Sequence, residues 1–494
     1  MDRFRSILTL VAAATIAGCN SSSVVVPPPI SPAKPIAHVI IMMQENRSFN
    51  NIFAGFPGAD TALSGACKPA KWCKTGTAKL KPVTLETTNV YGAGTDIDHS
   101  HQGSAYPSGY RGGFVEECDF DSATGVCRND GFDKIRHGEA GTGAVAKTYP
   151  YAYVERSETK AYWDFAKRYA LADHMFFSQT AASFISHQVI LSGTVALNSN
   201  ESLTDQPNDT PWGCDGQYGE TTPVLKANGK YIQFGPFPCF TEYPSMADVL
   251  DPAHVSWKYY VDAELSGSGN AGDFSGDVWN GYDAIAKVRC KTWKLPIKEP
   301  NDCHGYGADW IHISTPNGSI FRDIKGGTLP AVSWLIPSLK DSDHPASGCS
   351  GGPRWVSSVL NAIGGSKYWD STAVILLWDD WGGWYDPVPP PQTNYTSLGF
   401  RVGTVVISPW ARPNTVVHTQ YEFGSILKFI EQNFGLGSLH TTDETSTSIA
   451  DMFNFSQKPT KFVPEAPLPP KATCHSQNGV TAQQIIEHDG GVPE

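Results

Sequence analysis

Short apolar runs along the chain predict the strands of a sheet that is buried on both faces. In these runs apolar residues follow one another without the alternation of a strand that has one face in water. The runs are Ile36–Met43, Thr372–Trp378, Val402–Ile407 and, more weakly, Ala331–Ile336. Between them, apolar residues at helical spacing predict helices at Tyr162–Tyr169, Ser186–Leu191 and Phe423–Phe434.

Buried strands that alternate with helices predict an α/β fold, with a mostly parallel sheet flanked by helices on both faces. Residues 36–456 would form this domain, and a Pro-rich tail at 457–494 would follow it. Two segments, at about 60–150 and 195–310, are rich in Gly, Asp, Asn and Cys and have weak periodicity. We interpret them as disulfide-stapled insertions that wall the functional site and carry its substrate specificity.

The N-terminus predicts an exported protein. Arg3 and Arg5 precede an apolar run that is too short to span a bilayer, and Ala17 and Gly18 directly precede Cys19. This arrangement resembles a lipobox, in which residues 1–18 are a signal peptide and Cys19 is acylated. Residues 19–35 would then tether a periplasmic or outer-membrane lipoprotein to the membrane; the alternative is a plain signal peptide cut nearby.

The other cysteines predict disulfides. Setting Cys19 apart from the eleven cysteines leaves ten, an even number that suits an oxidising compartment. A zinc site is the alternative, but the sequence contains no C-x-x-C pair. The spacing suggests four short-range pairs and one long-range pair: Cys67–Cys73, Cys118–Cys127, Cys214–Cys239, Cys290–Cys303 and Cys349–Cys474.

The net charge argues against nucleic acid as a partner. The chain has 37 basic and 49 acidic side chains and a formal charge of −12, so it offers no general basic field to phosphate backbones. An anionic substrate would need positive charge at the site itself, and a metal ion is an economical source of it.

Two of the predicted strands end in acidic or amide residues. Ile36–Met43 runs into Gln44, Glu45 and Asn46, and Thr372–Trp378 runs into Asp379 and Asp380. Ligands of open α/β sheets bind beyond the carboxyl ends of the strands, so we expect both groups to meet at one edge. Oxygen ligands of this kind suit Mg, Ca or Mn, or zinc in a phosphoesterase, although carboxylates also cap helices. Gly382 and Gly383 would let the backbone turn tightly under these ligands.

Ser183 stands at the start of a predicted helix. A serine in this position is commonly an N-cap, but free N–H groups at a helix N-terminus also hold a phosphoryl group well. The surrounding residues do not form the G-x-S-x-G turn of esterases, which weakens a Ser-His-Asp interpretation.

Three of the fourteen histidines are candidates for chemistry. His344, in Asp341-Ser342-Asp343-His344-Pro345, follows a predicted strand and could protonate a leaving group. His99 and His101 alternate with acidic and polar residues, a pattern that suits contact with phosphate or a metal, a His-only zinc site or simply a polar loop.

These segments together resemble the bacterial phosphoesterase family of phospholipase C and acid phosphatase type, within the alkaline-phosphatase-like superfamily. The resemblance rests on four motifs in the family's order: Glu45-Asn46-Arg47-Ser48-Phe49, Ser183-Phe184-Ile185-Ser186-His187, Asp343-His344-Pro345 and Trp378-Asp379-Asp380-Trp381-Gly382-Gly383. Asn50, Pro387 and His187 depart from the family's usual Asp, His and Arg.

The resemblance implies hydrolysis of a phospholipid phosphodiester or a phosphomonoester through a phosphoseryl intermediate on Ser183. His344 would be the general acid, and His99, Asn46 and His187 would contact the substrate or its phosphate. One divalent ion (Ca, Mg, Mn or Zn) would be held by Glu45, Asn46, Ser183, Asp379 and Asp380. The alternatives are a metal-independent carboxylesterase that uses Ser183 with His344, and a ligand-binding surface lipoprotein without activity.

Overall fold

The computed structural model describes most of the chain from residue 35 onwards. The described residues are 35–68, 72–83, 85, 96–102, 112–138, 141, 143–261, 275–314, 319–338, 341–345, 351–392, 394–396 and 398–466. The predicted signal peptide, the tether with Cys19, and Cys349 and Cys474 lie outside them. Among the helices that are described, none has the length and apolar character that crossing a bilayer requires.

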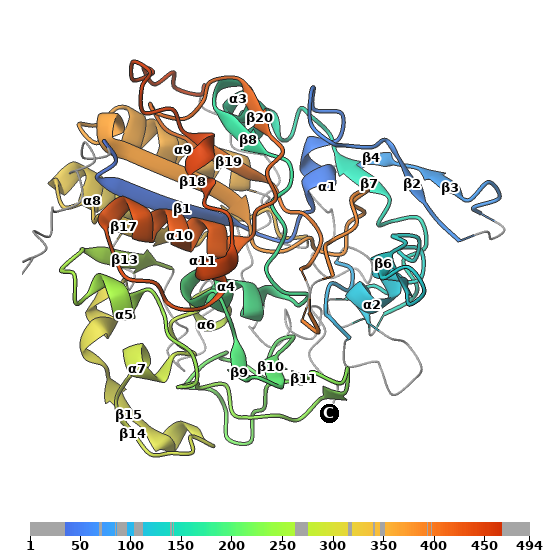
Figure 1. Cartoon of the computed structure of the whole chain (residues 1–494), viewed down its shortest axis with the longest axis horizontal. Helices are drawn as coiled ribbons and strands as arrows, with labels where there is room; N and C mark the ends of the chain where they lie inside the picture. The colour runs from blue at the N-terminus through green and yellow to red at the C-terminus, as the bar shows by residue number, and fades with distance from the viewer. Residues whose placement is uncertain are drawn as a thin grey trace, which may run out of the picture. The chain divides into compact units, whose positions relative to one another are not determined.

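An eight-stranded sheet lies at the centre of the molecule, in the order β16-β13-β17-β1-β18-β19-β8-β20 (Figure 1). The first five strands of this order, β16, β13, β17, β1 and β18, are parallel to one another. Strand β19 is antiparallel to both of its neighbours, and β20 is parallel to β8. The bounds are β1 His38–Gln44, β8 Ala170–Ala172, β13 Trp257–Tyr260, β16 Ile313–Ser314, β17 Val332–Leu335, β18 Thr372–Trp378, β19 Thr404–Ile407 and β20 Thr415–Val417. The prediction of a mostly parallel sheet is confirmed.

The strands in the middle of the sheet are completely buried, which explains their unbroken apolar sequences. Every residue of β18 is buried, as is every residue of β1 after His38. These two strands pair in register from His38 opposite Thr372 to Gln44 opposite Trp378. Their carboxyl ends therefore lie side by side.

Two groups of helices cover the faces of the sheet (Figure 1). In one group α9 contacts both α3 and α8, and in the other α10 contacts both α4 and α11. The bounds are α3 Lys160–Arg168, α4 Ser183–Ser192, α8 Ile320–Gly326, α9 Gly352–Gly364, α10 Phe423–Phe434 and α11 Thr442–Thr445. Helix α10 has the predicted bounds, and α4 begins earlier than predicted, at Ser183.

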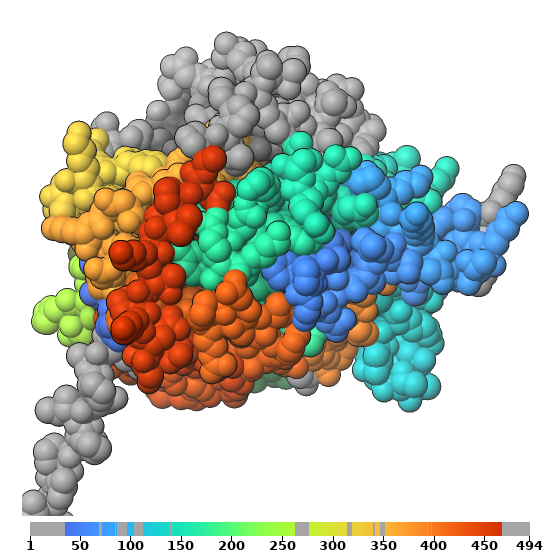
Figure 2. Space-filling view, turned by 90° about the horizontal axis from the view of Figure 1, so that it is seen from above, coloured from blue at the N-terminus to red at the C-terminus, as the bar shows by residue number. Residues whose placement is uncertain are grey.

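The two predicted insertions carry short elements outside the central sheet, with one exception. The first contains β2 Ser64–Ala66, β3 Thr77–Lys79, β4 Lys81–Val83, α2 Gly113–Cys118, β5 Phe120–Asp121 and β6 Val126–Cys127, with β7 Ala152–Val154 just beyond it; α1 Phe49–Phe53 precedes it. Its described part extends to one side of the molecule, in blue and cyan in Figure 2.

The second contains β9 Ala196–Asn198, β10 Glu201–Leu203, β11 Val224–Lys226, β12 Tyr231–Ile232, α5 Ala247–Leu250, α6 Ser275–Val278, α7 Ala286–Arg289, β14 Cys290–Trp293 and β15 Cys303–Tyr306. The exception is β13, which lies within 195–310 but pairs with β17 in the central sheet. The expectation that this whole segment leaves the sheet is therefore corrected.

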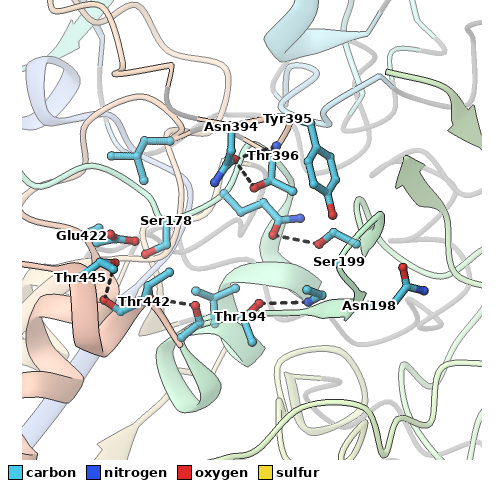
Figure 3. Close-up of a pocket in the computed structure, with 16 residues that line it drawn as sticks. Ser178, Thr194, Asn198, Ser199, Asn394, Tyr395, Thr396, Glu422, Thr442 and Thr445 are labelled. Carbon is cyan, nitrogen blue, oxygen red and sulfur yellow. Dashed lines mark hydrogen bonds between the residues drawn. The ribbon is translucent and has the colours of Figure 1, made fainter. Parts of the chain in front are cut away.

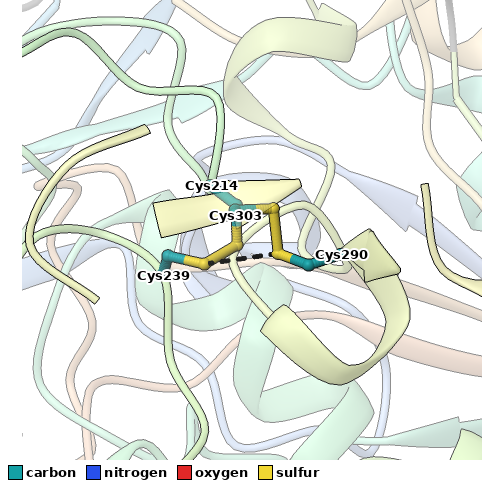
Figure 4. Close-up of side chains that lie close together, drawn as sticks. All are labelled: Cys214, Cys239, Cys290 and Cys303. Atoms are coloured by element: carbon teal, nitrogen blue, oxygen red, sulfur yellow. Dashed lines mark hydrogen bonds between the residues drawn. A yellow bond between two sulfur atoms is a disulfide. The ribbon is translucent and has the colours of Figure 1, made fainter. Parts of the chain in front are cut away.

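Four of the five predicted disulfides are present: Cys67–Cys73, Cys118–Cys127, Cys214–Cys239 and Cys290–Cys303. All four lie in the two insertions. The last two are neighbours, with Sγ of Cys239 4.0 Å from Sγ of Cys290 (Figure 4). Cys290–Cys303 joins β14 to β15, and Cys214–Cys239 closes the loop before them, so cross-links add to the small hydrophobic cluster of this segment.

The first residues of the predicted C-terminal tail pack against the domain. Trp369 Nε1 donates to the carbonyl oxygen of Thr460 at 2.9 Å, and Glu465 N donates to Asn361 Oδ1 at 3.0 Å. Residues 460–465 therefore contact the segment from α9 to β18, and the ordered part of the chain reaches beyond residue 456.

Glu220, in the second insertion, should make stability depend on pH. Burial, opposed by a hydrogen bond from Gln217 N and aided by Asp209 and Asp215, raises the pKa of this carboxyl to about 9. Because the folded protein then binds a proton that the unfolded chain releases near pH 4.5, Glu220 lowers stability progressively as pH rises from about 4.5 towards 9.

We therefore expect Glu220→Gln to stabilise the protein at pH 8 and to have little effect at pH 4. One pKa unit corresponds to about 1.4 kcal/mol, so the gain at pH 8 should exceed about 1 kcal/mol. Urea unfolding at the two pH values measures it. The exposed Glu155→Gln is the control and should stay within about 0.5 kcal/mol at both. Equal effects of Glu220→Gln at pH 4 and pH 8 would contradict the prediction.

Candidate active site

The first part of the site forms where β1 and β18 end side by side. Glu45 and Asn46 follow β1, Asp379 and Asp380 follow β18, and all four side chains are completely buried. Asn46 adopts a left-handed backbone conformation, with φ 57°, and its N–H donates to Asp379 Oδ1 at 2.8 Å. The structure thus brings together the two polar groups that the sequence analysis expected at one edge.

Gly382 and Gly383 allow the chain to turn beneath these side chains. Both have positive φ, and Gly382 N donates to Asp380 Oδ1 at 2.7 Å. A Cβ atom at Gly382 would lie 2.0 Å from the carbonyl oxygen of Asn46. Only glycine fits this approach, so the predicted turn is present.

Ser183 is the first residue of α4, and its side chain does not cap the helix. The N-cap is Ala182, so the capping interpretation does not hold. Instead, Ser183 Oγ lies 3.4 Å from both Asn46 Oδ1 and Asp380 Oδ2, within hydrogen-bond reach of each. The hydroxyl therefore sits between the two strand ends and at the N-terminus of a ten-residue helix.

His99 reaches this group from the first insertion, whereas His101 does not. His99 Nδ1 donates to the carbonyl oxygen of Ile97 at 2.8 Å, which leaves Nε2 to accept from Asn46 Nδ2 at 2.9 Å. Burial lowers the pKa of His99 to about 4, so the ring is neutral at pH 7. His101 Nδ1 lies 2.7 Å from Thr180 Oγ1, which fits the polar-loop interpretation for this residue.

His344 is held near the end of β1 by the hydrogen bonds of the preceding residue, Asp343. Asp343 N donates to Gln44 Oε1 at 2.9 Å, and Asp343 Oδ2 accepts from Trp378 Nε1 at 3.0 Å. His344 Nδ1 lies 2.5 Å from the carbonyl oxygen of Pro345 and therefore carries a proton. Burial lowers the pKa of His344 to about 4, and His99 and Arg47 also lower it.

His187 lies one helical turn after Ser183, on the same face of α4. Its Nε2 is 3.3 Å from Glu45 Oε1, and Glu45, His187 and Asp379 each offer one ligand atom within 4.8 Å of the other two. Burial lowers the pKa of this ring to about 4 as well. The sequence analysis placed His187 with the substrate-binding residues; the structure places it beside two of the predicted metal ligands.

Three further side chains contact the site and were missed in the sequence. Ser186 Oγ lies 2.9 Å from the carbonyl oxygen of Ser183 and 3.3 Å from Asp379 Oδ2, and its spacing of three residues from Ser183 on one helix was an available signal. The ring of Trp279 stacks on His187 with centroids 6.2 Å apart, and Tyr259 Oη lies 3.4 Å from His187 Nδ1. Trp279 comes from the second insertion and Tyr259 from β13, and nothing in the sequence pattern marked either residue.

The buried carboxylates leave the site short of positive charge. The pKa values of Glu45 and Asp380 lie well above the usual range for carboxyls. Burial is the main cause, and the neighbouring carboxylate of Asp379 is the second. Both carboxylate oxygens of Glu45 lack a hydrogen-bond donor. Within the described residues, Glu45 and Asp380 approach histidine nitrogens, and no lysine or arginine pairs with them. Buried acceptors without donors are what a divalent cation would satisfy, so the residues fit the predicted metal.

Two other features of the described chain are formed by residues outside this group. Asp251, Asp309 and His312 approach one another but are partly exposed. A polar cavity of about 340 Å³ is lined from the C-terminal part of α4 and from neighbouring loops, with Ser178, Thr194, Asn198 and Glu422 among its walls (Figure 3). It contains none of the predicted site residues.

Comparisons with known proteins agree with the motifs. Residues 36–437 match the model of the Phosphoesterase family. The chain is 24% identical over 446 residues to the hemolytic phospholipase C of Pseudomonas aeruginosa, and the alignment covers 81% of this chain and 53% of that protein. It is 25% identical over 485 residues to phospholipase C A of Mycobacterium tuberculosis, and this alignment covers 88% of this chain and 80% of that protein.

The chain therefore spans about half the length of the first relative and four fifths of the second. Among solved structures, a phosphonate monoester hydrolase from Silicibacter pomeroyi is 11% identical at a TM-score of 0.31, covering 62% of this chain and 73% of that one. Because the family match spans most of the chain, the predicted family and enzyme class are both confirmed. This chain belongs to the phosphoesterase family, whose members are hydrolases of phosphate-ester bonds.

Proposed function

We propose that the protein hydrolyses phosphate esters by attack of the Ser183 hydroxyl on phosphorus. The observation that carries this proposal is the position of Ser183 Oγ, 3.4 Å from both Asn46 and Asp380 at the start of α4. The free N–H groups of the first helical turn favour a phosphoryl group at this place. In the first step the hydroxyl would give its proton to Asp380 Oδ2, 3.4 Å away, as the Oγ–P bond forms and the bond to the leaving-group oxygen breaks. Water then breaks the Oγ–P bond, its oxygen leaves with the phosphate and a proton returns to Oγ.

A divalent cation fits the same place. Glu45, Asn46, Ser183, Asp379 and Asp380 would hold it, since their oxygens converge and Glu45 lacks any donor. When bound, such an ion would lower the pKa of the serine hydroxyl and stabilise negative charge on the phosphoryl oxygens.

The protein's own side chains would position the substrate. His99, held by Ile97 and bonded to Asn46, fixes the amide that faces Ser183. His344 is our candidate for the proton donor to the leaving-group oxygen.

A leaving-group comparison tests the role of His344. We expect His344→Asn to slow hydrolysis of an alkyl phosphate ester by about 10²- to 10⁴-fold, and of a p-nitrophenyl ester much less, because p-nitrophenolate leaves without a proton. Burial lowers the pKa of His344 to about 4, so its protonated fraction rises as pH falls. The difference from the wild type should therefore be larger at pH 5 than at pH 8. Equal losses on both esters would remove His344 from this role.

The names of the relatives favour a phospholipid as substrate, and we propose a phospholipid phosphodiester before a phosphomonoester. The experiment is a hydrolysis panel of phosphatidylcholine, p-nitrophenyl phosphate and bis-p-nitrophenyl phosphate, each with and without a chelator. We expect turnover of the phospholipid, and loss of all turnover after exhaustive chelation with recovery when the divalent ion is returned. Full turnover after chelation would overturn the role of the cation.

The carboxylesterase alternative finds less support in the site. Within the described residues, the hydrogen bonds of Ser183 Oγ go to Asn46 and Asp380, and none goes to a histidine that could act as its base. A carboxylesterase would cleave p-nitrophenyl acetate without metal and react with fluorophosphonates; we expect neither. A surface protein without activity is disfavoured because every side chain of the proposed site is in place.

We also propose that the mature protein is a lipoprotein anchored through Cys19 in the periplasm or on the outer membrane, on the evidence of the N-terminal sequence. The mass of the N-terminal peptide of the membrane-extracted protein tests this. An unmodified Cys19, or a mature chain that begins elsewhere, would overturn it.

A further inference from the structure

The imidazole of His187 is buried against acidic oxygens in an arrangement that is unfavourable without a positive centre. The side chain is completely buried, and its Nε2 makes no hydrogen bond. This nitrogen lies 3.3 Å from Glu45 Oε1, which also lacks a hydrogen-bond donor. Asp379 completes the group, in which the three ligand atoms lie within 4.8 Å of one another.

The hydrogen bonds on the far side of the ring show which nitrogen carries the proton. Tyr259 Oη donates its single proton to the carbonyl oxygen of Trp279, at 2.6 Å. Towards His187 Nδ1, 3.4 Å away, the same hydroxyl can therefore only accept. Nδ1 of the neutral ring thus carries the hydrogen, and Nε2 presents its lone pair to Glu45.

A lone pair that faces a carboxylate oxygen in a buried place is unfavourable unless something positive lies between them. A single proton could bridge Nε2 and Glu45, but it would bring no positive charge to Asp379, whose nearest donor is the neutral N–H of Asn46 at 2.8 Å. A cation would satisfy all three groups at once. In a metal-binding histidine, the ring nitrogen that does not bind the metal usually donates a hydrogen bond to a fixed partner, as Nδ1 of His187 does to Tyr259.

We propose that His187 binds the active-site cation directly through Nε2, together with Glu45 and Asp379, and that Tyr259 is its positioning residue. This inference rests on the cation of the proposed function and goes beyond the oxygen ligands that the motifs imply. A neutral imidazole suits zinc and first-row transition ions, whereas calcium and magnesium take oxygen ligands. The site should therefore prefer the first class.

Pulsed electron paramagnetic resonance of bound Mn²⁺ tests the contact directly. The full-length protein is freed of metal, loaded with one equivalent of Mn²⁺, and prepared with natural and with ¹⁵N-labelled histidine. We expect a histidine nitrogen coupling that changes with the label, is lost in His187→Asn and remains in His344→Asn, which removes a neighbouring buried imidazole. If His187→Asn does not fold, a coupling that survives both His99→Asn and His344→Asn assigns the nitrogen to His187.

The outcomes separate this inference from the proposed function. Bound Mn²⁺ without a histidine coupling, or a coupling that persists in His187→Asn, would overturn the contact while the cation and Ser183 keep their roles. A wild-type protein that binds no cation would overturn both.

The choice of metal provides a second measurement that does not depend on turnover. In calorimetric titrations we expect His187→Asn to weaken Zn²⁺ binding by at least about tenfold, as the loss of a ligand or its support does. Binding of Ca²⁺, which does not need the nitrogen, should change much less. An equal loss for both ions would contradict the proposed preference.

Discussion

Replacing Ser183 with Ala should reduce phosphate-ester hydrolysis by at least about 10⁴-fold, because the variant lacks the oxygen that we propose attacks phosphorus. The overall structure should survive the change. The two contacts of the hydroxyl are long, at 3.4 Å each, and the side chain does not cap α4. The measurement is kcat on a chromogenic phosphodiester at a saturating concentration of cation, with circular dichroism to confirm the fold.

Two serine variants of the same helix provide the controls. Ser186→Ala removes a hydroxyl that also reaches the acidic group, through Asp379 at 3.3 Å, but leaves the nucleophile in place. We expect it to retain at least about a tenth of the activity, as removal of a single hydrogen bond does. Ser183→Thr keeps a hydroxyl and should retain more activity than Ser183→Ala. A Ser183→Ala protein with more than about a hundredth of wild-type turnover would show that another group attacks phosphorus.

The sequence was sufficient to predict the strands that the site depends on. The bounds of β18 are those predicted, because an apolar run between polar residues has few other interpretations. The strands that were missed are short or contain polar residues. Strand β8 has three residues, and β13 contains Lys258 in a segment otherwise rich in polar loops. Their pairing depends on contacts that are distant in sequence, which a local pattern does not report.

The site residues likewise divide into those that a local sequence signal predicts and those that only tertiary packing brings to the site. Glu45, Asn46, Asp379 and Asp380 were found because acidic and amide residues at the ends of buried strands are a local signal. That β1 and β18 are neighbours is a property of the sheet order. The sequence left the role of Ser183 open between cap and nucleophile; the structure places Ala182 at the cap, and the nucleophile stays a prediction. Tyr259 reaches the site from β13, a strand that the sequence pattern missed, and Trp279 from the loop after α6, where tertiary packing alone decides which side chains point inwards.

Asp380→Asn should have opposite effects on activity and on the stability of the metal-free protein. We expect hydrolysis to fall by at least about 10³-fold, since the variant loses a charge that the cation needs. Without metal, however, the wild-type protein buries Asp380 beside Asp379, and burial and this neighbour raise the pKa of Asp380 well above its usual range. An asparagine can still accept the hydrogen bond from Gly382 N, observed at 2.7 Å, without the charge. We therefore expect metal-free Asp380→Asn to be more stable than the metal-free wild type by about 1 to 3 kcal/mol in urea unfolding.

When the cation is added, the wild type should become more stable than Asp380→Asn. A ligand that binds only the folded protein stabilises it by about 2.7 kcal/mol at a concentration of one hundred times its dissociation constant, and the variant binds it more weakly. Asp386→Asn is the matched control, because Asp386 is equally buried but pairs with Arg401, with Arg401 Nε 2.8 Å from Asp386 Oδ1. Removing that charge leaves a buried arginine without its partner and should destabilise the protein by about 3 to 5 kcal/mol with or without metal. If Asp380→Asn behaved like Asp386→Asn, the buried carboxylates would already be compensated within the protein, and the argument for a cation between β1, β18 and α4 would fail.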